Sequence, residues 1–151
     1  MIEPLRVLIA EDEAVVLMQL EELLEDTGHE IVGTAMTAEE AIALTRERHP
    51  ELLLLDVHLK DGSSGLDVAR AVRDIADVTV VFLTANVRKL SDDMDGAAAA
   101  IAKPFNEAAL ASSIAYLEEC VHRPPPLLDL PVGMSLAPAY LARMDGLRAD
   151  A

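Results

Sequence analysis

The sequence LLLLDVHLKDGSSG, residues 52–65, places four consecutive leucines directly before Asp56. A run this short that is apolar at every position is typical of a strand in a parallel sheet, because such strands are buried on both faces. Similar runs occur elsewhere along the chain, at residues 7–10, 31–33, 78–83 and 97–102. The sequence therefore predicts five short buried strands.

Amphipathic helical patterns follow these runs. Apolar side chains repeat at helical spacing in five segments, at residues 16–24, 38–45, 66–72, 87–94 and 110–121, of which the fourth contains the fewest. Gly28 and Pro50 end the first two patterns, and Asn106 is the N-cap candidate for the last. The order is (βα)5, and right-handed crossovers would place helices on both faces of the sheet. We therefore expect an α/β fold with a doubly wound five-stranded parallel sheet.

Charge and proline content change at about residue 122. Residues 123–151 contain three basic and three acidic side chains, so the formal net charge of -15 resides entirely in residues 1–122. Three consecutive prolines from Pro124 onward cannot continue a helix, because they lack N–H groups and their rings clash with the preceding turn. We expect a folded domain over 1–122 and a proline-rich C-terminal tail over 123–151. Apolar spacing in the tail indicates a short helix at 137–149, which either frays or packs on the domain or on a second copy of it.

The composition argues against several functional classes. The chain has 27 acidic and 12 basic side chains and a pI near 4.4, which disfavours binding to nucleic-acid phosphates or to an anionic membrane surface. Cys120 is the only cysteine, so neither an internal disulfide nor a zinc site is expected. No apolar run approaches the roughly 20 residues that span a bilayer, and the N-terminus is unlike a signal peptide. A cytoplasmic location is expected.

Polar side chains follow four of the predicted strands. Glu11 and Asp12 follow the first, Asp56 the third, Thr84 the fourth and Lys103 the fifth. Ligands bind outside the carboxyl ends of strands in an open parallel sheet, so these groups should meet at one edge. Crowded carboxylates stay ionised only with a cation among them, and an all-oxygen set suits Mg2+. A nearby ammonium and hydroxyl would bind phosphoryl oxygens, which makes a strand-end carboxylate a suitable nucleophile toward phosphorus.

Each of these residues has a common structural role when taken alone. An aspartate after a strand usually caps a helix or turn, acids at 11–13 could cap the first helix, and a single lysine before a proline carries little information. Independent capping roles do not easily explain an acid pair, an aspartate, a threonine and a lysine at successive strand ends. We therefore interpret them as one phosphoryl-transfer site.

The sequence resembles a receiver domain of bacterial two-component response regulators, of the stand-alone type. The matching stretches are VLIAEDE (7–13), LLLLDVHLKDGSSGLDVAR (52–70), VVFLTAN (80–86) and IAKPF (101–105), and the resemblance covers about residues 5–121. It implies a flavodoxin-like fold in which Asp56 is the phosphoacceptor. The implied donor is a phosphohistidine on a sensor histidine kinase or a histidine phosphotransfer protein.

The resemblance also implies roles for the other strand-end residues. The implied Mg2+ ligands are Glu11, Asp12, Asp56 and the backbone carbonyl of His58. Thr84 and Lys103 would contact the phosphoryl group and report the phosphorylated state. Such a domain is not an enzyme acting on other molecules, because it catalyses only its own phosphorylation and dephosphorylation.

The implied output is a protein–protein switch in phosphorelay signal transduction. The responding face would comprise the fourth helix (87–94), the fifth strand (97–102) and the fifth helix after Asn106. It would bind a downstream protein partner or form a homodimer. Ala100 stands where receiver domains usually carry Tyr or Phe, so the resemblance leaves the route of the signal open. The 29 residues after residue 122 are too few for a DNA-binding domain with its own core.

Two other classes remain as alternatives. One is a pseudo-receiver that acts as a constitutive interaction module, for which Ala100 is the support. The other is a phosphohydrolase of the haloacid-dehalogenase kind, which also uses an aspartyl nucleophile and Mg2+. That chemistry requires a second aspartate two residues after the nucleophile, and His58 occupies this position.

Overall fold

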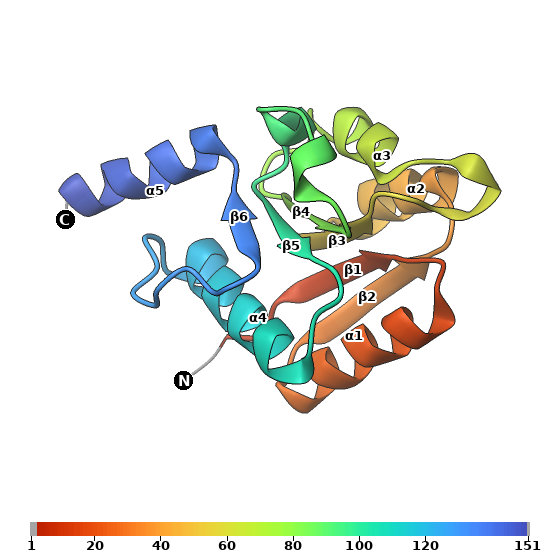
Figure 1. The fold of residues 1–151 in the computed structure, drawn as a ribbon, viewed down its shortest axis with the longest axis horizontal. Helices are drawn as coiled ribbons and strands as arrows, with labels where there is room; N and C mark the ends of the chain where they lie inside the picture. The colour runs from red at the N-terminus through yellow and green to blue at the C-terminus, as the bar shows by residue number, and fades with distance from the viewer. Residues whose placement is uncertain (1–2, 151) are drawn as a thin grey trace.

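The fold is a six-stranded sheet covered by helices on both faces (Figure 1). A computed structural model describes residues 3–150. The strands are β1 (Arg6–Ala10), β2 (Glu30–Ala35), β3 (Leu52–Asp56), β4 (Thr79–Thr84), β5 (Ala99–Ala102) and β6 (Met134–Leu136). The helices are α1 (Ala14–Asp26), α2 (Ala38–Arg48), α3 (Gly65–Ala71), α4 (Glu107–His122) and α5 (Pro138–Ala149). The strand order is β2-β1-β3-β4-β5-β6, which confirms the α/β fold with a parallel-dominated sheet.

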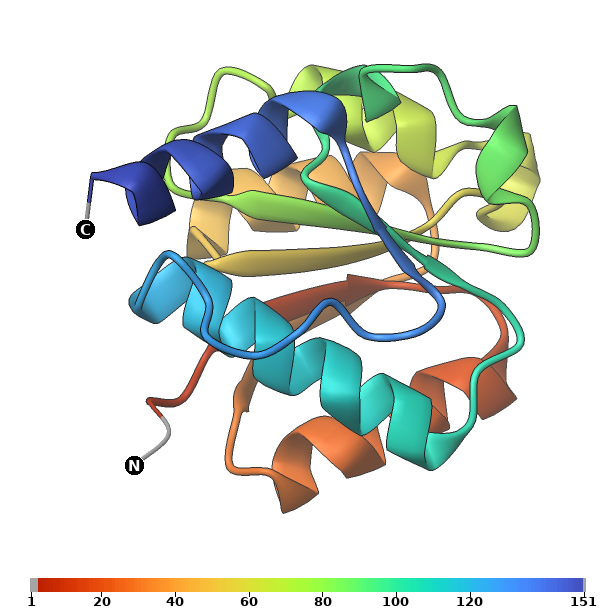
Figure 2. The same ribbon diagram turned by 60° about the vertical axis from the view of Figure 1, so that its left-hand side comes forward.

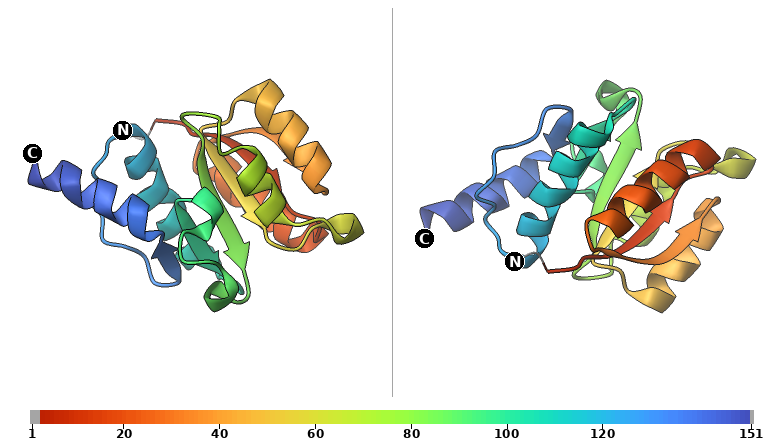
Figure 3. Two further views of the ribbon diagram at one scale, coloured as in Figure 1. Left: turned by 90° about the horizontal axis from the view of Figure 1, so that it is seen from above. Right: turned by 90° about the horizontal axis from the view of Figure 1, so that it is seen from below.

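The core lies in two layers, one on each face of the sheet. Helices α1 and α4 pack on one face through apolar residues such as Leu20 and Leu117, and α2 and α3 pack on the other through Ala41 and Val68 (Figure 3). The four leucines of β3 are fully buried because their side chains alternate between the two layers. This burial explains why β1 and β3, which are interior strands of the sheet, are apolar at nearly every position.

Side-chain caps fix where three of the helices begin. The Thr37 side chain accepts a hydrogen bond from the backbone N–H of Glu40 at the start of α2, and the Ser64 side chain accepts one from Leu66 at the start of α3. Asn106 Oδ1 accepts from Ala109 N at 2.7 Å, which confirms the predicted N-cap of α4. Each cap satisfies one of the N–H groups that a helix leaves unpaired at its first turn.

The helix predicted over 87–94 is wrong. Two 3-10 turns, Val87–Lys89 and Met94–Gly96, occupy this part of the chain instead. The Asp93 carboxylate accepts from Asp95 N and from the Ser91 hydroxyl, so local side chains satisfy the backbone in a non-helical arrangement. With few apolar residues to bury, the segment lacks the packing that stabilises most helices in proteins.

The tail joins the sheet, which has six strands where five were predicted. Strand β6 runs antiparallel to β5 and pairs Ile101 with Met134 and Ala99 with Leu136. A three-residue strand is too short to leave a periodic signal in the sequence, and its backbone pairing with β5 is what makes it a strand. The helix expected at 137–149 lies at Pro138–Ala149, and its Met144 is buried against the rest of the chain.

No helix among residues 3–150 combines the length and the apolar content that crossing a membrane requires.

Buried His29 makes the stability of the fold depend on pH. His29 is 7% exposed, and its Nδ1 accepts a hydrogen bond from Leu5 N at 2.9 Å. Burial lowers the pKa of His29, with a smaller opposing effect from the charge of Glu118. The folded state therefore favours the neutral ring, so stability that is complete above the unfolded pKa of about 6.5 is lost as the pH falls below it.

We expect His29→Asn to flatten this part of the pH dependence, because the amide oxygen can still accept from Leu5 N but does not titrate. The measurement is the free energy of unfolding in urea across this pH range. His49→Asn is the matched control, because His49 is exposed and adopts a left-handed conformation that asparagine tolerates. If the free energy of unfolding changed equally with pH in the wild type and in His29→Asn, His29 would not be the source of the pH dependence.

Candidate functional site

The carboxyl edge of the sheet brings together the polar residues that follow its strands. Glu11 and Asp12 come directly after β1, and Asp56 ends β3, the neighbour of β1. Thr84 ends β4 and Lys103 follows β5. The predicted convergence at one edge therefore occurs.

Lys103 connects two buried carboxylates. Its Nζ donates to Glu11 Oε1 at 2.8 Å and to Asp56 Oδ2 at 3.0 Å. The side chain of Glu11 is fully buried and that of Asp56 is 6% exposed, so water screens these contacts little. A third acid, Glu13, lies 4.0 Å from the same Nζ but is mostly exposed.

Burial and these contacts shift the acidity of the whole group. Burial raises the pKa of Glu11 to about 7, and its hydrogen bond with Asp56 adds to the effect. Burial acts on Asp56 in the same direction, but hydrogen bonds from Glu11 and Lys103 outweigh it and hold the Asp56 pKa below its usual value. Burial lowers the pKa of Lys103, and its hydrogen bonds to the two carboxylates outweigh this and raise it. Asp56 is therefore kept as an anion, and any proton that the pair shares resides on Glu11.

The donor set fits a hard divalent cation. Glu11, Asp12 and Asp56 each offer a carboxylate oxygen, and these oxygens lie within 4.8 Å of one another. One ammonium cannot balance three carboxylates in so small a volume, so a further cation is electrostatically favoured. Oxygen ligands with open positions suit Mg2+, which retains several waters in protein sites.

The backbone after β3 orients the Asp56 carboxylate. Its Oδ1 accepts from the backbone N–H of His58 at 3.0 Å, while Oδ2 faces Lys103. The His58 side chain is exposed. The role of the His58 carbonyl as a metal ligand stays a prediction.

Thr84 ends β4, the strand beside β3, and a backbone hydrogen bond joins it to Lys103. The Thr84 hydroxyl oxygen accepts from Asn86 N at 3.1 Å, and the Thr84 carbonyl accepts from Lys103 N at 2.8 Å. Thr84 is only 7% exposed. Its hydroxyl hydrogen is therefore free to be donated to an anion bound beside Asp56, since the hydroxyl uses only its acceptor capacity in the Asn86 contact.

Gly65 is a site residue that sequence reasoning missed. A Cβ at this position would lie 2.2 Å from the backbone oxygen of Asp56, far inside van der Waals contact. Gly65 N also donates to Val57 O at 2.9 Å, so the start of α3 is fastened to the end of β3. The signal available in the sequence was the glycine that closes DGSSG nine residues after the aspartate.

We expect Gly65→Ala to destabilise the protein by about 1 to 3 kcal/mol, because the added methyl group must displace the β3 backbone. Urea unfolding measures the loss. Gly146→Ala, in α5, is the matched control, since a Cβ there meets nothing within 4 Å and alanine favours a helix. Equal stabilities for Gly65→Ala and the wild type would show that the contact can relax freely.

Comparison with known proteins gives consistent matches. Residues 7–115 match the family model of the response regulator receiver domain. The phyllosphere-induced regulator PhyR of Methylorubrum extorquens is 38% identical over 122 residues, which cover 78% of this chain and 46% of that protein. The polar-differentiation response regulator DivK of Brucella ovis is 32% identical over 106 residues, which cover 66% of this chain and 85% of DivK.

Solved structures agree with these matches. The solution NMR structure of the PhyR REC domain of Erythrobacter litoralis aligns with a TM-score of 0.65 at 32% identity, covering 83% of this chain and 97% of that one. The chain spans about half the length of the PhyR and PdtaR relatives among the curated proteins that it matches.

Proposed function

The chain belongs to the response regulator receiver domain family, and from this premise we propose that Asp56 accepts a phosphoryl group from a phosphohistidine on a partner protein. The donor would be a sensor histidine kinase or a histidine phosphotransfer protein in a phosphorelay. The observation that carries the proposal is the contact of Lys103 with both Glu11 and Asp56 at 2.8 and 3.0 Å, beside the acidic cluster.

In the proposed transfer, a carboxylate oxygen of Asp56 forms a bond to phosphorus while the bond from phosphorus to the donor imidazole nitrogen breaks. Lys103, already in contact with Asp56, pairs with a phosphoryl oxygen, and the Thr84 hydroxyl donates to another. Glu11, Asp12, Asp56 and the His58 carbonyl would hold Mg2+, which supplies charge neutralisation at the phosphoryl oxygens. The chain in this account catalyses only its own phosphorylation and dephosphorylation.

The phosphodonor has an open approach beside Lys103. A cavity of about 280 Å³ adjoins Lys103 and is lined by apolar groups that include Val16 and Phe105. On the first turns of α1, Val15 and Met18 are 78% and 65% exposed. We propose that a donor protein packs on this apolar surface and presents its phosphohistidine to Asp56.

The proposed output is a change in protein–protein contacts at β4, β5 and their neighbouring turns. Phosphorylation adds about -1.5 to -2 charges at Asp56, which would draw Thr84 and Lys103 toward the new oxygens. Lys103 N donates a hydrogen bond to Thr84 O, and Ala102 N donates one to Gly133 O just before β6, both at 2.8 Å. A shift at the site would therefore reach the turns at 87–96 and the β5–β6 pair together.

This output surface differs from the one expected from sequence. The helix expected at 87–94 is absent, and β6 pairs with the edge of β5 that the predicted five-stranded sheet would leave open. Ala100 is fully buried between Phe82 and Ser135 in the sheet. Because β5 contains only alanine and isoleucine, it has no aromatic side chain that could change position on phosphorylation. We propose that the turns at 87–96 carry the change to a downstream protein partner.

The test is incubation of the protein with acetyl phosphate, with and without Mg2+, followed by intact-mass measurement. We expect a gain of about 80 Da, one phosphoryl group, only when Mg2+ is present. A chain that gains no mass with Mg2+ would be a pseudo-receiver that works without phosphorylation. Steady release of phosphate from a phosphate ester would favour the phosphohydrolase alternative.

A further inference from the structure

The segment that leads from α4 to β6 presents apolar side chains to solvent. Leu127, Leu128, Leu130 and Val132 are 92%, 46%, 47% and 94% exposed, and we call residues 127–132 the apolar strip. They are half of the large apolar side chains that are exposed among residues 3–150. Single exposed leucines are ordinary on protein surfaces, but four within six residues indicate a contact surface.

The apolar strip is held in place by its backbone. Leu127 N and Leu128 N donate to Glu119 Oε1 of α4 at 2.8 and 2.9 Å, and Arg148 of α5 donates to Pro126 O at 3.1 Å. Prolines at 124–126 and 131 restrict the backbone further. Figure 2 shows this segment running along the outer side of α4. An ordered strip loses little conformational entropy when it binds, which favours association.

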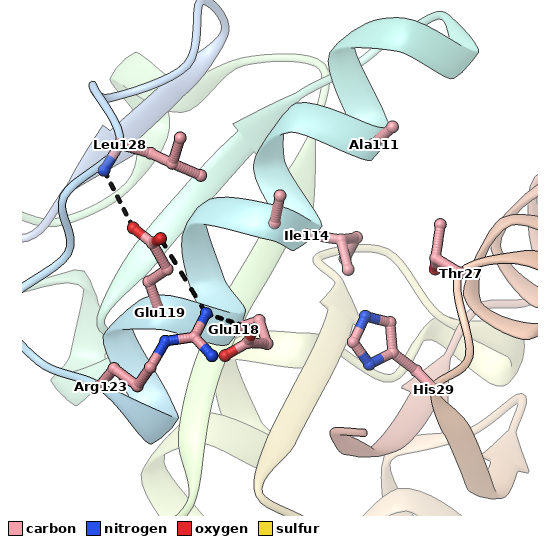
Figure 4. Close-up of a pocket in the computed structure, with 9 residues that line it drawn as sticks. Thr27, His29, Ala111, Ile114, Glu118, Glu119, Arg123 and Leu128 are labelled. Atoms are coloured by element: carbon pink, nitrogen blue, oxygen red, sulfur yellow. Dashed lines mark hydrogen bonds and ion pairs between the residues drawn. The ribbon is translucent and has the colours of Figure 1, made fainter. Parts of the chain in front are cut away.

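A largely apolar cavity of about 210 Å³, which Glu118, Glu119 and Arg123 also line, adjoins the strip. Ala111, Ile114 and Leu128 line one part of it and Thr27 and His29 another (Figure 4). For comparison, a protein cavity of roughly 150 Å³ can hold benzene. An apolar side chain from another molecule could therefore enter it beside the strip.

The distribution of charge along the chain favours a second copy of the chain as the molecule that binds the strip. Residues 123–151 carry no net charge, whereas residues 1–122 carry the whole -15. Two copies would repel each other wherever their acidic surfaces meet, and they meet with least repulsion where each presents its neutral tail. An anionic lipid surface would be repelled by the same charge. A surface that is apolar and ordered on both molecules can pair with itself about a two-fold axis.

We propose that two copies of the chain associate through their apolar strips, with Leu127 and Val132 of each copy packing on the strip and the adjacent cavity of the other. A standard interface buries about 800 Å² on each partner, and a six-residue strip offers less, so the dimer is weak and its population depends on concentration. Added salt strengthens it, because screening removes the repulsion between acidic surfaces and leaves apolar contact intact.

The test is sedimentation of the full chain over a concentration series, in about 0.1 M and about 1 M NaCl, where the Debye length is about 10 and 3 Å. We expect the weight-average mass to rise above 16.2 kDa with concentration, and more steeply at high salt. The double variant Leu127→Asp, Val132→Asp should stay at the monomer mass. Val15→Asp, Met18→Asp is the control, because it adds the same two charges at exposed apolar residues of α1, away from the strip, and should associate like the wild type.

Three results would overturn the proposal. A wild-type chain that is monomeric at both salt concentrations excludes a second copy as the occupant. Association that weakens with salt indicates ion pairs. If the α1 control fails to associate while the strip variant still does, the interface includes α1 and not the strip. None of these results depends on phosphorylation, so failure here is distinct from failure at Asp56.

Discussion

Replacing Asp56 with Asn is expected to abolish the gain of a phosphoryl group in the presence of acetyl phosphate and Mg2+. The amide has nearly the shape of the carboxylate but carries no charge and is a poor nucleophile. The surrounding fold should persist, because the backbone N–H of His58 can still bond the amide oxygen and one of the crowded carboxylates is removed. The loss of the adduct is therefore expected to be complete and free of unfolding.

Intact mass measures this outcome, and circular dichroism checks that the variant is folded. Asp61→Asn is the matched control. Asp61 lies in the loop after β3, is exposed and has a left-handed conformation that asparagine accepts, so its variant should phosphorylate like the wild type. An adduct of equal yield on Asp56→Asn would contradict the proposed role.

Replacing Lys103 with Ala is expected to have the second largest effect. The ammonium pairs with two buried carboxylates, Glu11 and Asp56, at 2.8 and 3.0 Å. Without it we expect the free energy of unfolding to fall by about 2 to 3 kcal/mol in metal-free buffer. This is less than the roughly 3 to 5 kcal/mol for breaking a fully buried pair, because the Lys103 side chain retains 15% exposure. The loss should be greater above pH 7 than below, because protonation of Glu11, whose pKa burial raises to about 7, relieves the repulsion.

Urea unfolding with EDTA or with Mg2+ measures this prediction. Mg2+ should recover part of the stability of Lys103→Ala, since the same three carboxylates can be compensated by a divalent ion. The control is Lys89→Ala, an exposed lysine in the first of the 3-10 turns, which should unfold like the wild type. An undiminished stability of Lys103→Ala in EDTA would show that the ammonium does not compensate the acids.

The sheet and the residues at its edge could be predicted from sequence because both depend on local patterns. Continuous apolar runs such as Leu52–Leu55 mark buried parallel strands, and chain direction then places Asp56 and Lys103 at the same edge. The same reasoning could not anticipate β6, because a three-residue strand exists only through its hydrogen bonds to β5.

The remaining differences have similar physical causes. The helix expected at 87–94 had the weakest apolar pattern, and hydrogen bonds from the Ser91 hydroxyl and Asp95 N to the Asp93 carboxylate stabilise turns there instead. Gly65 has no side chain that would indicate a function. It matters because its backbone packs so closely on the backbone oxygen of Asp56 that a Cβ would not fit. Local sequence spacing therefore identified the charged groups of the site, but it could not identify the close backbone packing between Gly65 and Asp56.

Chemical mapping of the phosphorylated wild-type protein tests most directly whether Asp56 is the acceptor. Borohydride reduces an aspartyl phosphate to homoserine, so reduction followed by peptide mass analysis records which aspartate held the phosphoryl group. Homoserine at position 56, and only after treatment with the phosphodonor and Mg2+, is the result that the proposed site predicts. Homoserine at another position, with aspartate unchanged at 56, would contradict it.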